Sequence, residues 1–378
     1  MNLSDLGRNA YMLKGSLAKR GYMRWWHSFT GKEESSGKER TFFIEYFLIN
    51  PGLGGDTPIF GQHPHYKKKG MKPSYCMIKA GAYPTGEEEG VELHAYFPAN
   101  ALHVAQKPFH LQIEENECSE DRIRGYVDVT DQDASYPFLM TDSGVMEWNL
   151  ELNKSIACHT GPIAGRLSSF FNALDTFWHA EGIQTQYRGT VTLNGASYRV
   201  DIESSYGYAD KHWGRNYNYP WLQLSSCHLF SRKTGRELKY SALAVEGCCP
   251  RFLCFSLKPK LMLQLTYTGE DYCFSFARPF SFSRVRWKKK ESGKRFIWHI
   301  KGQNRDSYVK LSASCLKQDM MPLRYENPLG LRRKAPLWSG GNGTGCIELY
   351  RITPQGSEWL DTLELRHVLC DYQLHNKS

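Results

Sequence analysis

The stretch GTVTLNGASYRVDIE, residues 189–203, predicts a β-hairpin. At its centre, Asn194 and Gly195 supply the positive φ angles that a tight two-residue hairpin turn requires. Beyond the turn, Tyr198, Val200 and Ile202 alternate with polar residues, which indicates a strand with one dry face and one wet face. We therefore begin from a β interpretation of the chain.

Similar signals occur on both sides of this hairpin. The run TFFIEYFLI at 41–49 is closed by the turn sequence Asn50-Pro51-Gly52, and a second hairpin is expected at 285–300 around a turn at 291–294. Further strands are expected at 91–97, 109–113, 308–312 and 346–352, whereas the glycine-rich segment SGGNGTG at 339–345 is expected to be a loop. Aromatic residues, which favour sheets, make up 13% of the chain. The expected fold class is all-β, with antiparallel barrels or sandwiches.

The length of 378 residues suits two domains. Helical periodicity is clear once, where apolar residues recur at steps of three and four after the breaker Thr160-Gly161-Pro162. These apolar residues are Leu167, Phe170, Phe171, Leu174, Phe177 and Trp178. We expect a short linking helix there, with an N-terminal β domain at 1–165 and a C-terminal β domain at 166–378.

Composition narrows the class of protein. We find no secretory leader and no run near the about 20 apolar residues of a membrane span. The 11 cysteines are an odd, scattered set, which predicts reduced thiols in a cytoplasmic protein. The cluster Cys248, Cys249 and Cys254 lacks the second half of a metal site, so no metal is expected. No phosphate loop or dinucleotide fingerprint is found.

Positive charge is concentrated at 281–310, which holds ten Lys or Arg residues against Glu291 and Asp306 within a net charge of +9. One interpretation is a solvated hairpin. The other is contact with an anionic surface, such as a peripheral contact with a membrane. No nucleic-acid-binding motif accompanies the charge, so no nucleic-acid partner is expected.

The most distinctive stretch is YGYADKHWGRNYNYPWLQ, residues 206–223. In an extended chain, Tyr206, Tyr208, Asp210 and His212 share one face, and Lys211 lies on the other. Two rings beside an acid and a base suit a cavity that delivers a proton, because burial raises the pKa of a carboxyl group. The alternative is structural: Asp210 pairs with a neighbouring cation or a backbone cap, and the rings are ordinary core.

This stretch resembles the signature of the tocopherol cyclase family, and the segment GYMRWW at 21–26 resembles the family's N-terminal strand. The matching residues are Tyr208, Asp210, Lys211, Trp213, Gly214, Pro220, Trp221 and Gln223. Members usually have Ser-Phe-Pro where this chain has Asn216-Tyr217-Asn218-Tyr219 before the proline, so the substrate can differ. The resemblance implies two lipocalin-like barrels, related to carotenoid hydratase-type proteins, and an apolar, often isoprenoid, substrate. In the cyclase reaction an acid protonates a prenyl double bond and a phenol oxygen captures the cation, without a redox cofactor.

Three functions follow as hypotheses. The first is a tocopherol cyclase-like isomerase with Asp210 as proton donor, His212 as its partner and Lys211 as an orienting charge. Its substrate contacts would come from the motif and from the RWWH segment at 24–27, through Tyr206, Tyr208, Trp213, Trp221, Gln223, Arg24 and Trp26. In that segment, adjacent rings should lie on opposite faces of a strand. The second hypothesis is a lipocalin-like carrier or sensor of an apolar ligand, and the third is an interaction protein that uses the basic segment.

Overall fold

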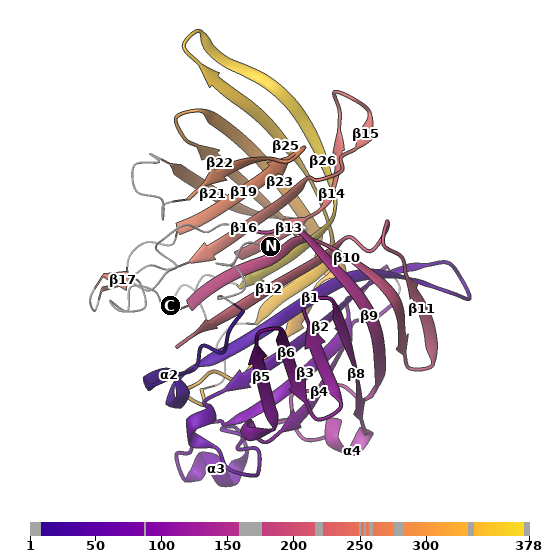
Figure 1. Cartoon of the computed structure of the whole chain (residues 1–378), viewed down its shortest axis with the longest axis vertical. Helices are drawn as coiled ribbons and strands as arrows, with labels where there is room; N and C mark the ends of the chain where they lie inside the picture. Colours follow the sequence, from indigo (N-terminus) through magenta and orange to yellow (C-terminus); the bar gives the residue numbers. More distant parts are fainter. Residues whose placement is uncertain are drawn as a thin grey trace.

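The computed structural model describes residues 9–86, 88–158, 176–215, 222–248, 251–252, 255–256, 260–275, 283–331 and 336–373. Its strands form two large antiparallel sheets, the first from the N-terminal part of the chain and the second from the C-terminal part (Figure 1). The predicted all-β class, with two antiparallel β units, is confirmed. None of the helices in the described part of the chain is long and apolar enough to cross a membrane.

The first sheet has twelve strands in the order β4-β3-β2-β1-β11-β10-β9-β8-β7-β6-β5. The remaining strand, β12, pairs with both β1 and β10. The elements are α2 (Ser16–Lys19), β1 (Tyr22–Glu33), β2 (Glu39–Ile49), η1 (Pro51–Leu53), α3 (Pro64–Lys68), β3 (Tyr75–Ala82), β4 (Val91–Phe97), η2 (Ala99–Ala101), β5 (Leu102–Gln106), β6 (Phe109–Ile113), β7 (Asn116–Ser119), β8 (Arg122–Val129), α4 (Asp131–Ala134), β9 (Gly144–Ile156), β10 (Thr176–Leu193), β11 (Ala196–Val200) and β12 (Gly207–Gly214).

The second sheet also has twelve strands, with the main path β20-β19-β16-β13-β26-β25-β23-β22-β21 and with β14, β15 and β24 beside it. A separate small ribbon pairs β17 with β18. The elements are β13 (Leu222–Ser226), β14 (His228–Ser231), β15 (Arg236–Glu237), β16 (Ala242–Cys248), β17 (Arg251–Phe252), β18 (Phe255–Ser256), β19 (Lys260–Tyr267), β20 (Glu270–Phe274), β21 (Arg284–Ser292), β22 (Arg295–Gln303), β23 (Ser307–Leu316), η4 (Lys317–Asp319), β24 (Met321–Leu323), β25 (Leu337–Thr353) and β26 (Gly356–Gln373).

Each sheet has its own apolar core, and a third apolar cluster joins the two sheets. We call the region of this third cluster the seam. Strand β1 supplies both sides, because alternate side chains of a strand point to opposite faces. Trp25 packs in the core of the first sheet, and Trp26 packs in the seam, stacked on Phe43 at 5.3 Å. The expectation of two rings on opposite faces is confirmed.

The hairpin predicted at 189–203 is present as β10 and β11, with φ angles of 50° at Asn194 and 84° at Gly195. The strands expected at 91–97 and 109–113 match β4 and β6, and those at 41–49, 308–312 and 346–352 lie within β2, β23 and β25. The second predicted hairpin is β21 and β22. These segments share a strict two-residue alternation or a turn that fixes the register.

The glycine-rich segment at 339–345 was expected as a loop, and this expectation is wrong, because it lies inside β25. Gly341 lets the second sheet approach the first, because a Cβ atom there would lie 2.6 Å from Thr41 Cγ2 and 2.7 Å from Tyr83 Cδ2. The register of β25 against β26 also shifts within this segment. Glycine here therefore serves close packing inside a strand rather than a turn.

The predicted linking helix falls mostly outside the described residues, but its last two members, Phe177 and Trp178, lie in strand β10. The predicted boundary at residue 165 also lies outside them and stays a prediction. The two sheets themselves change over between Gly214, the end of β12, and Leu222, the start of β13. Strands β10 to β12 therefore belong to the first sheet.

Candidate functional site

Residues Gly207–Gly214 of the predicted motif form β12, and all eight are buried. Strand β12 lies between β1 and β10, so one of its faces meets the core of the first sheet and the other meets the seam. Tyr208 belongs to the seam cluster and Trp213 to the core of the first sheet. The alternation inferred from the sequence therefore holds, and Asp210 and His212 share the seam face with Tyr208, as their hydrogen bonds show.

Asp210 is the centre of the site and is fully buried. Its Oδ2 atom accepts four hydrogen bonds, from the Tyr208 hydroxyl at 2.8 Å, Gln223 Nε2 at 3.0 Å, Trp178 Nε1 at 3.1 Å and His212 Nε2 at 3.1 Å. Its Oδ1 atom has no hydrogen-bond partner among the described residues. Three of the donors come from the first sheet and Gln223 comes from β13 of the second, so the site exists only where the two sheets meet.

The protonation states follow from these contacts. Burial alone would raise the pKa of Asp210, but His212, Arg24 and the Tyr208 hydroxyl outweigh it and lower this pKa below its usual range. Burial thus acts in the expected direction, but the expectation of a net raised pKa for Asp210 is wrong. Burial lowers the pKa of His212 to about 4 and raises that of Tyr208 well above its ordinary value. At neutral pH the site holds a carboxylate with a neutral imidazole and a neutral phenol as donors.

Two further carboxyl groups reach the seam from the second sheet. Glu246 on β16 and Asp371 on β26 each lie directly opposite Gln223 on β13, so the three side chains form a row on one face. Neither carboxylate oxygen of Glu246 has a hydrogen-bond partner among the described residues. Burial, reinforced by the charge of Asp210, raises the pKa of Glu246 well above its usual range. Burial likewise raises the pKa of Asp371 to about 6, although Ser339 donates a hydrogen bond to it.

The positive charge of Arg24 acts on all three of these acids. Arg24 on β1 is buried opposite His212 and lies 3.7 Å from Glu45. Burial lowers its pKa, but Tyr325 and the acids Asp210, Glu45 and Asp371 outweigh burial and raise it. Because one guanidinium cannot neutralise every carboxyl group around it, the carboxyl groups with the fewest hydrogen-bond donors have the raised pKa values. The seam thus places Asp210, whose pKa is lowered, near Glu246, whose pKa is raised.

Sequence reasoning missed Trp178, Glu246 and Asp371. Trp178 was assigned to a helix, whereas it is paired with His212 across β10 and β12. The two acids stand alone inside apolar runs, ALAVEG at 242–247 and VLCDYQ at 368–373. An acid at an inward position of an apolar strand is a signal that could have identified both.

Two predicted site residues of β12 lie on its other face. Lys211 is buried with its ammonium group 4.9 Å from the Trp25 ring and 5.3 Å from the Trp213 ring, and it donates a hydrogen bond to the Ala10 carbonyl. Trp213 stacks on Phe177 at 5.5 Å. The structure therefore does not bring Lys211 or Trp213 to Asp210, because a strand cannot present neighbouring residues on the same face.

The other predicted residues divide between the seam and its margin. Trp26 is paired with Asp210 across β1 and β12, and the Arg24 guanidinium lies 5.2 Å from its ring. Tyr206 lies just before β12 with a φ of 40° and stacks on His228 at 3.8 Å. Gln223 Oε1 has no hydrogen-bond partner among the described residues, so it can accept one from a substrate. Trp221 lies outside the described residues.

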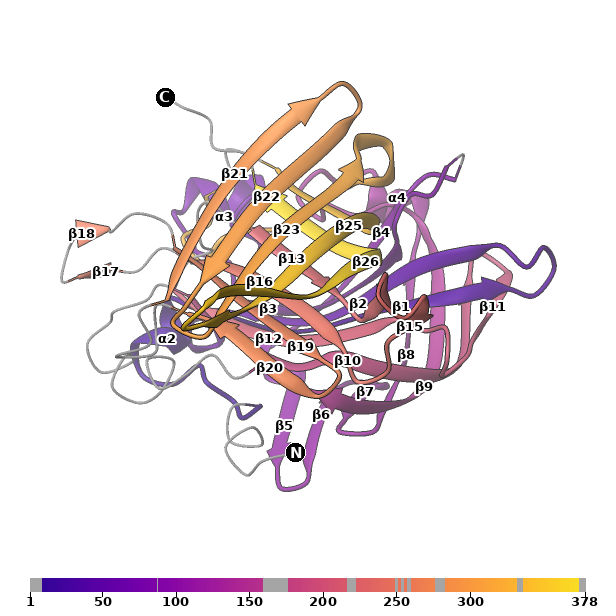
Figure 2. The ribbon, with the colours of Figure 1, turned by 90° about the horizontal axis from the view of Figure 1, so that it is seen from above.

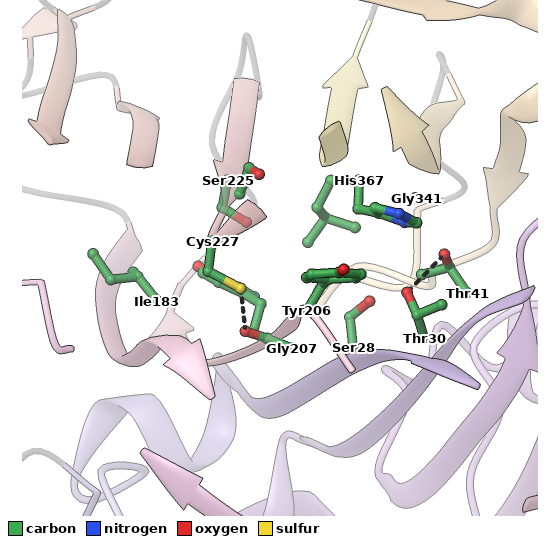
Figure 3. A pocket seen from close by; sticks show the side chains of 13 residues that line it. Ser28, Thr30, Thr41, Ile183, Tyr206, Gly207, Ser225, Cys227, Gly341 and His367 are labelled. Atoms are coloured by element: carbon green, nitrogen blue, oxygen red, sulfur yellow. Dashed lines mark hydrogen bonds between the residues drawn. The ribbon is translucent and has the colours of Figure 1, made fainter. Parts of the chain in front are cut away.

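Small cavities adjoin the site. One, of about 10 Å³, lies in the seam beside Tyr206 and Tyr208, between hydroxyl-bearing side chains of the two sheets such as Ser28 and Ser225 (Figure 3). Another, also of about 10 Å³, is bounded by Trp178, Ala244 and apolar residues of β19. Each volume admits about one water molecule.

A larger cavity of about 690 Å³ lies in the first sheet, between β4 and β8. Phe60, Tyr96, Phe97 and Val127 are among its lining residues. Its size is that of a typical small-molecule site. Among the described residues, no group of three or more His, Cys, Asp or Glu side chains is arranged to hold a metal ion.

No protein-family model matches the chain, and no curated protein sequence matches it. Several solved structures are similar over most of the chain. Among them are an AttH protein from Nitrosomonas europaea (12% identity, 91% of this chain and 92% of that chain, TM-score 0.44), CghA with Sch210972 (9%, 95% and 90%, 0.46) and kievitone hydratase from Nectria haematococca (10%, 91% and 88%, 0.43). With TM-scores below 0.5, these similarities carry no argument about activity.

Proposed function

We propose that this protein is an enzyme that catalyses a proton-driven intramolecular addition, of the tocopherol cyclase type, on an apolar prenylated or polyene-like substrate. The observation that carries the proposal is the pair of carboxyl groups at the seam. Asp210 is held ionised by four donors, whereas the pKa of Glu246 is raised by burial. Two titratable groups whose environments push their pKa values apart suit an acid and a base. The motif's resemblance to the tocopherol cyclases supports the same chemistry.

In this mechanism Glu246 is the general acid, a revision of the role first given to Asp210. The O–H bond of Glu246 breaks and its proton adds to one carbon of a prenyl double bond, leaving a cation on the other carbon. A hydroxyl oxygen of the substrate then forms the C–O bond and releases its proton toward the carboxylate of Asp210. Substrate and product are isomers, and atoms and electrons balance once the proton taken up by Asp210 passes back to Glu246.

Aromatic side chains and apolar residues around Glu246 suit such an intermediate. The Trp178 indole and the Tyr208 phenol both contact Asp210, and aromatic faces stabilise a cation by about 0.5–2 kcal/mol each. Met262 lies directly opposite Glu246, and Ala244 precedes it by two residues on the same face. Both line the small cavity next to Trp178. Gln223 Oε1 would accept a hydrogen bond from the hydroxyl group of the substrate.

The test starts with native mass spectrometry and organic extraction of the protein purified from its own host. A co-purifying prenylated phenol or polyene supplies the substrate, and a panel of prenylated hydroquinones replaces it if none is found. Conversion to an isomer of equal mass is followed by chromatography. Removal of a general acid or base lowers a rate by about 10²–10⁴-fold, so Glu246→Gln and Asp210→Asn should each lose activity on that scale.

The matched control is Glu237→Gln, which changes an exposed acid of the second sheet by the same single atom. It should retain the wild-type rate. Full turnover by Glu246→Gln would reject the proposed general acid. Full turnover by Asp210→Asn would reject the proposed base.

A second candidate function is a carrier of an apolar ligand, which the 690 Å³ cavity favours, because the described cavities beside Tyr208 and Trp178 admit only about one water molecule each. The variant Ala95→Trp would fill the large cavity, which Ala95 lines. If the protein is a carrier, this variant should lose an unaltered co-purifying ligand while Asp210→Asn and Glu246→Gln keep it. If it is the proposed enzyme, the reverse pattern is expected in the turnover assay.

A further inference from the structure

The free edge of the second sheet carries a broad basic surface on its outer side. Along β21, β22 and β23, more buried side chains alternate with more exposed ones, and Phe296, Trp298 and Ile300 are buried in the core of the second sheet. The opposite side is largely exposed along β21 and β22, and we call it the basic face. Figure 2 shows this hairpin at the edge of the second sheet. Its exposed cationic side chains are Arg284, Arg286, Lys288, Lys290, Arg295 and Lys301.

Like charges lie directly opposite one another on this face. Arg286 pairs with Lys301 across β21 and β22, and Lys301 pairs with Lys310 across β22 and β23. Glu348 on β25 continues the row and bonds Lys310 at 2.8 Å. Like charges at directly opposite positions destabilise a sheet. Outward-facing positions in the bodies of β21, β22 and β23, all within the described residues, hold no acid, so an external anion would relieve this repulsion.

The need to keep a sheet edge from pairing with another chain does not explain all the cations of the basic face. Charged side chains, lysine above all, are common on edge strands because they prevent pairing with another chain. This explains Lys288 and Lys290 on β21, the last strand of the sheet. It does not explain Lys301, since β22 is paired on both sides. The basic face therefore requires a second explanation.

We propose that the basic face docks on the anionic headgroups of a membrane surface. A broad array of cations on one side of a sheet complements the diffuse charge of acidic lipids, which attract each nearby Lys or Arg. Single-stranded nucleic acids instead need open aromatic faces for stacking. The exposed-side rings of Tyr308 and Tyr350 contact each other at 5.6 Å, and the Lys310 ammonium lies 5.7 and 5.2 Å from their centres. These rings are already occupied, which favours the lipid surface.

The test is co-sedimentation of the full chain with vesicles of phosphatidylcholine alone or with about one third phosphatidylserine. Binding should require the acidic lipid and weaken as salt is raised. A lysine or arginine near a membrane surface contributes about fivefold to partitioning. The triple variant Arg286→Gln/Lys288→Gln/Lys301→Gln should therefore bind about 100-fold more weakly, with an unchanged melting temperature or a higher one.

The matched control is Lys67→Gln/Lys68→Gln/Lys69→Gln, which removes three exposed charges near α3 of the first sheet. It should bind acidic vesicles within about threefold of the wild type. Equal loss in both triple variants would overturn the proposal, because net charge rather than the basic face would then be responsible. Binding to neutral vesicles, absence of vesicle binding, or tighter binding to a single-stranded oligonucleotide than to acidic vesicles would also overturn it.

Discussion

Two buried glutamates, Glu92 of the first sheet and Glu246 of the second, differ in how many partners surround their carboxyl groups. Glu92 on β4 contacts Lys79 at 2.8 Å, His94 at 2.9 Å and Arg324 at 2.9 Å, and it also accepts a hydrogen bond from the backbone of Arg324. Glu246 on β16 has no hydrogen-bond partner for either oxygen among the described residues. Both are almost completely buried. Cations and hydrogen-bond donors therefore offset the burial of the Glu92 carboxylate, whereas no hydrogen bond from a described residue offsets the burial of the Glu246 carboxyl group.

The difference separates structural from chemical roles. Burial would raise the pKa of Glu92, but Lys79, His94 and Arg324 lower it below its usual range. Arg324 follows β24 of the second sheet, so Glu92 ties the two sheets together. Glu246 retains a raised pKa and an uncompensated cost of burial. A group that costs stability without helping the fold is a candidate for function.

The largest effect is expected from Glu92→Gln. Removal of one charge from a buried, hydrogen-bonded ion pair leaves the partners uncompensated and costs about 3–5 kcal/mol. The loss should appear as a lower free energy of unfolding in urea at pH 7. The surface pair of Arg232 and Glu364 provides the control, because Glu364→Gln should cost at most about 1 kcal/mol. Equal losses of unfolding free energy in the two variants would mean that the buried contacts of Glu92 stabilise the fold no more than a surface ion pair does.

The next effect is a pH dependence from Asp371, whose pKa is raised from 3.8 to about 6. Between these two values the folded state holds a proton that the unfolded state has lost, so the free energy of unfolding falls as pH rises from about 4 to 6. The contribution of Asp371 to stability should decrease by about 3 kcal/mol across this window and stay constant above it.

The measurement compares wild type with Asp371→Asn by urea unfolding at pH 4 and pH 7. The difference in unfolding free energy between the two proteins should shift by that amount, in favour of the variant at the higher pH. Glu92 and Asp210, with lowered pKa values, act in the opposite sense, since their stabilisation is lost only on acidification below about pH 4. A constant difference at both pH values would show that Asp371 is ionised throughout.

The sequence predicted the strands well where alternation and turns are local properties. The Asn194-Gly195 turn and the alternation around it specify one register without help from distant residues. The segment at 339–345 was misassigned because Gly341 packs against Thr41 and Tyr83, which lie more than 250 residues away in sequence. Patterns of neighbouring residues in the sequence do not show where two sheets must pack closely.

The candidate site was predicted in part for the same reason. Tyr208, Asp210 and His212 are neighbours on one strand, so alternation was enough to group them. Glu246 and Asp371 join them only through the pairing of β13 with β16 and β26. The ionisation of Asp210 depends on donors from three different strands, which the sequence does not place side by side.

A smaller effect is expected at Tyr325. This residue contacts both Lys79, which pairs with Glu92, and Arg24, whose charge acts on Asp210. Its hydroxyl donates to Glu45 at 2.9 Å and accepts from Arg24 at 3.3 Å, while its ring lies 3.3 Å from the Lys79 ammonium. Tyr325→Phe retains the ring and removes the hydroxyl, so it should lower the unfolding free energy by about 1.5–2 kcal/mol. The exposed Tyr136→Phe is the control, with no measurable change. A loss below about 0.5 kcal/mol would show that Arg24 and Glu45 do not need this hydroxyl.

The smallest effect should have the opposite sign. Glu246→Met replaces an uncompensated buried carboxyl group with an apolar side chain of similar length, next to Met262 and Ala244. Burial of a polar group without a partner costs about 1–3 kcal/mol, part of which repacking offsets, so the variant should gain about 1 kcal/mol in unfolding free energy. The same variant should lose the proposed turnover, because it has no proton to donate. A destabilised Glu246→Met would mean that the carboxyl group stabilises the fold, and Glu246 would then resemble Glu92.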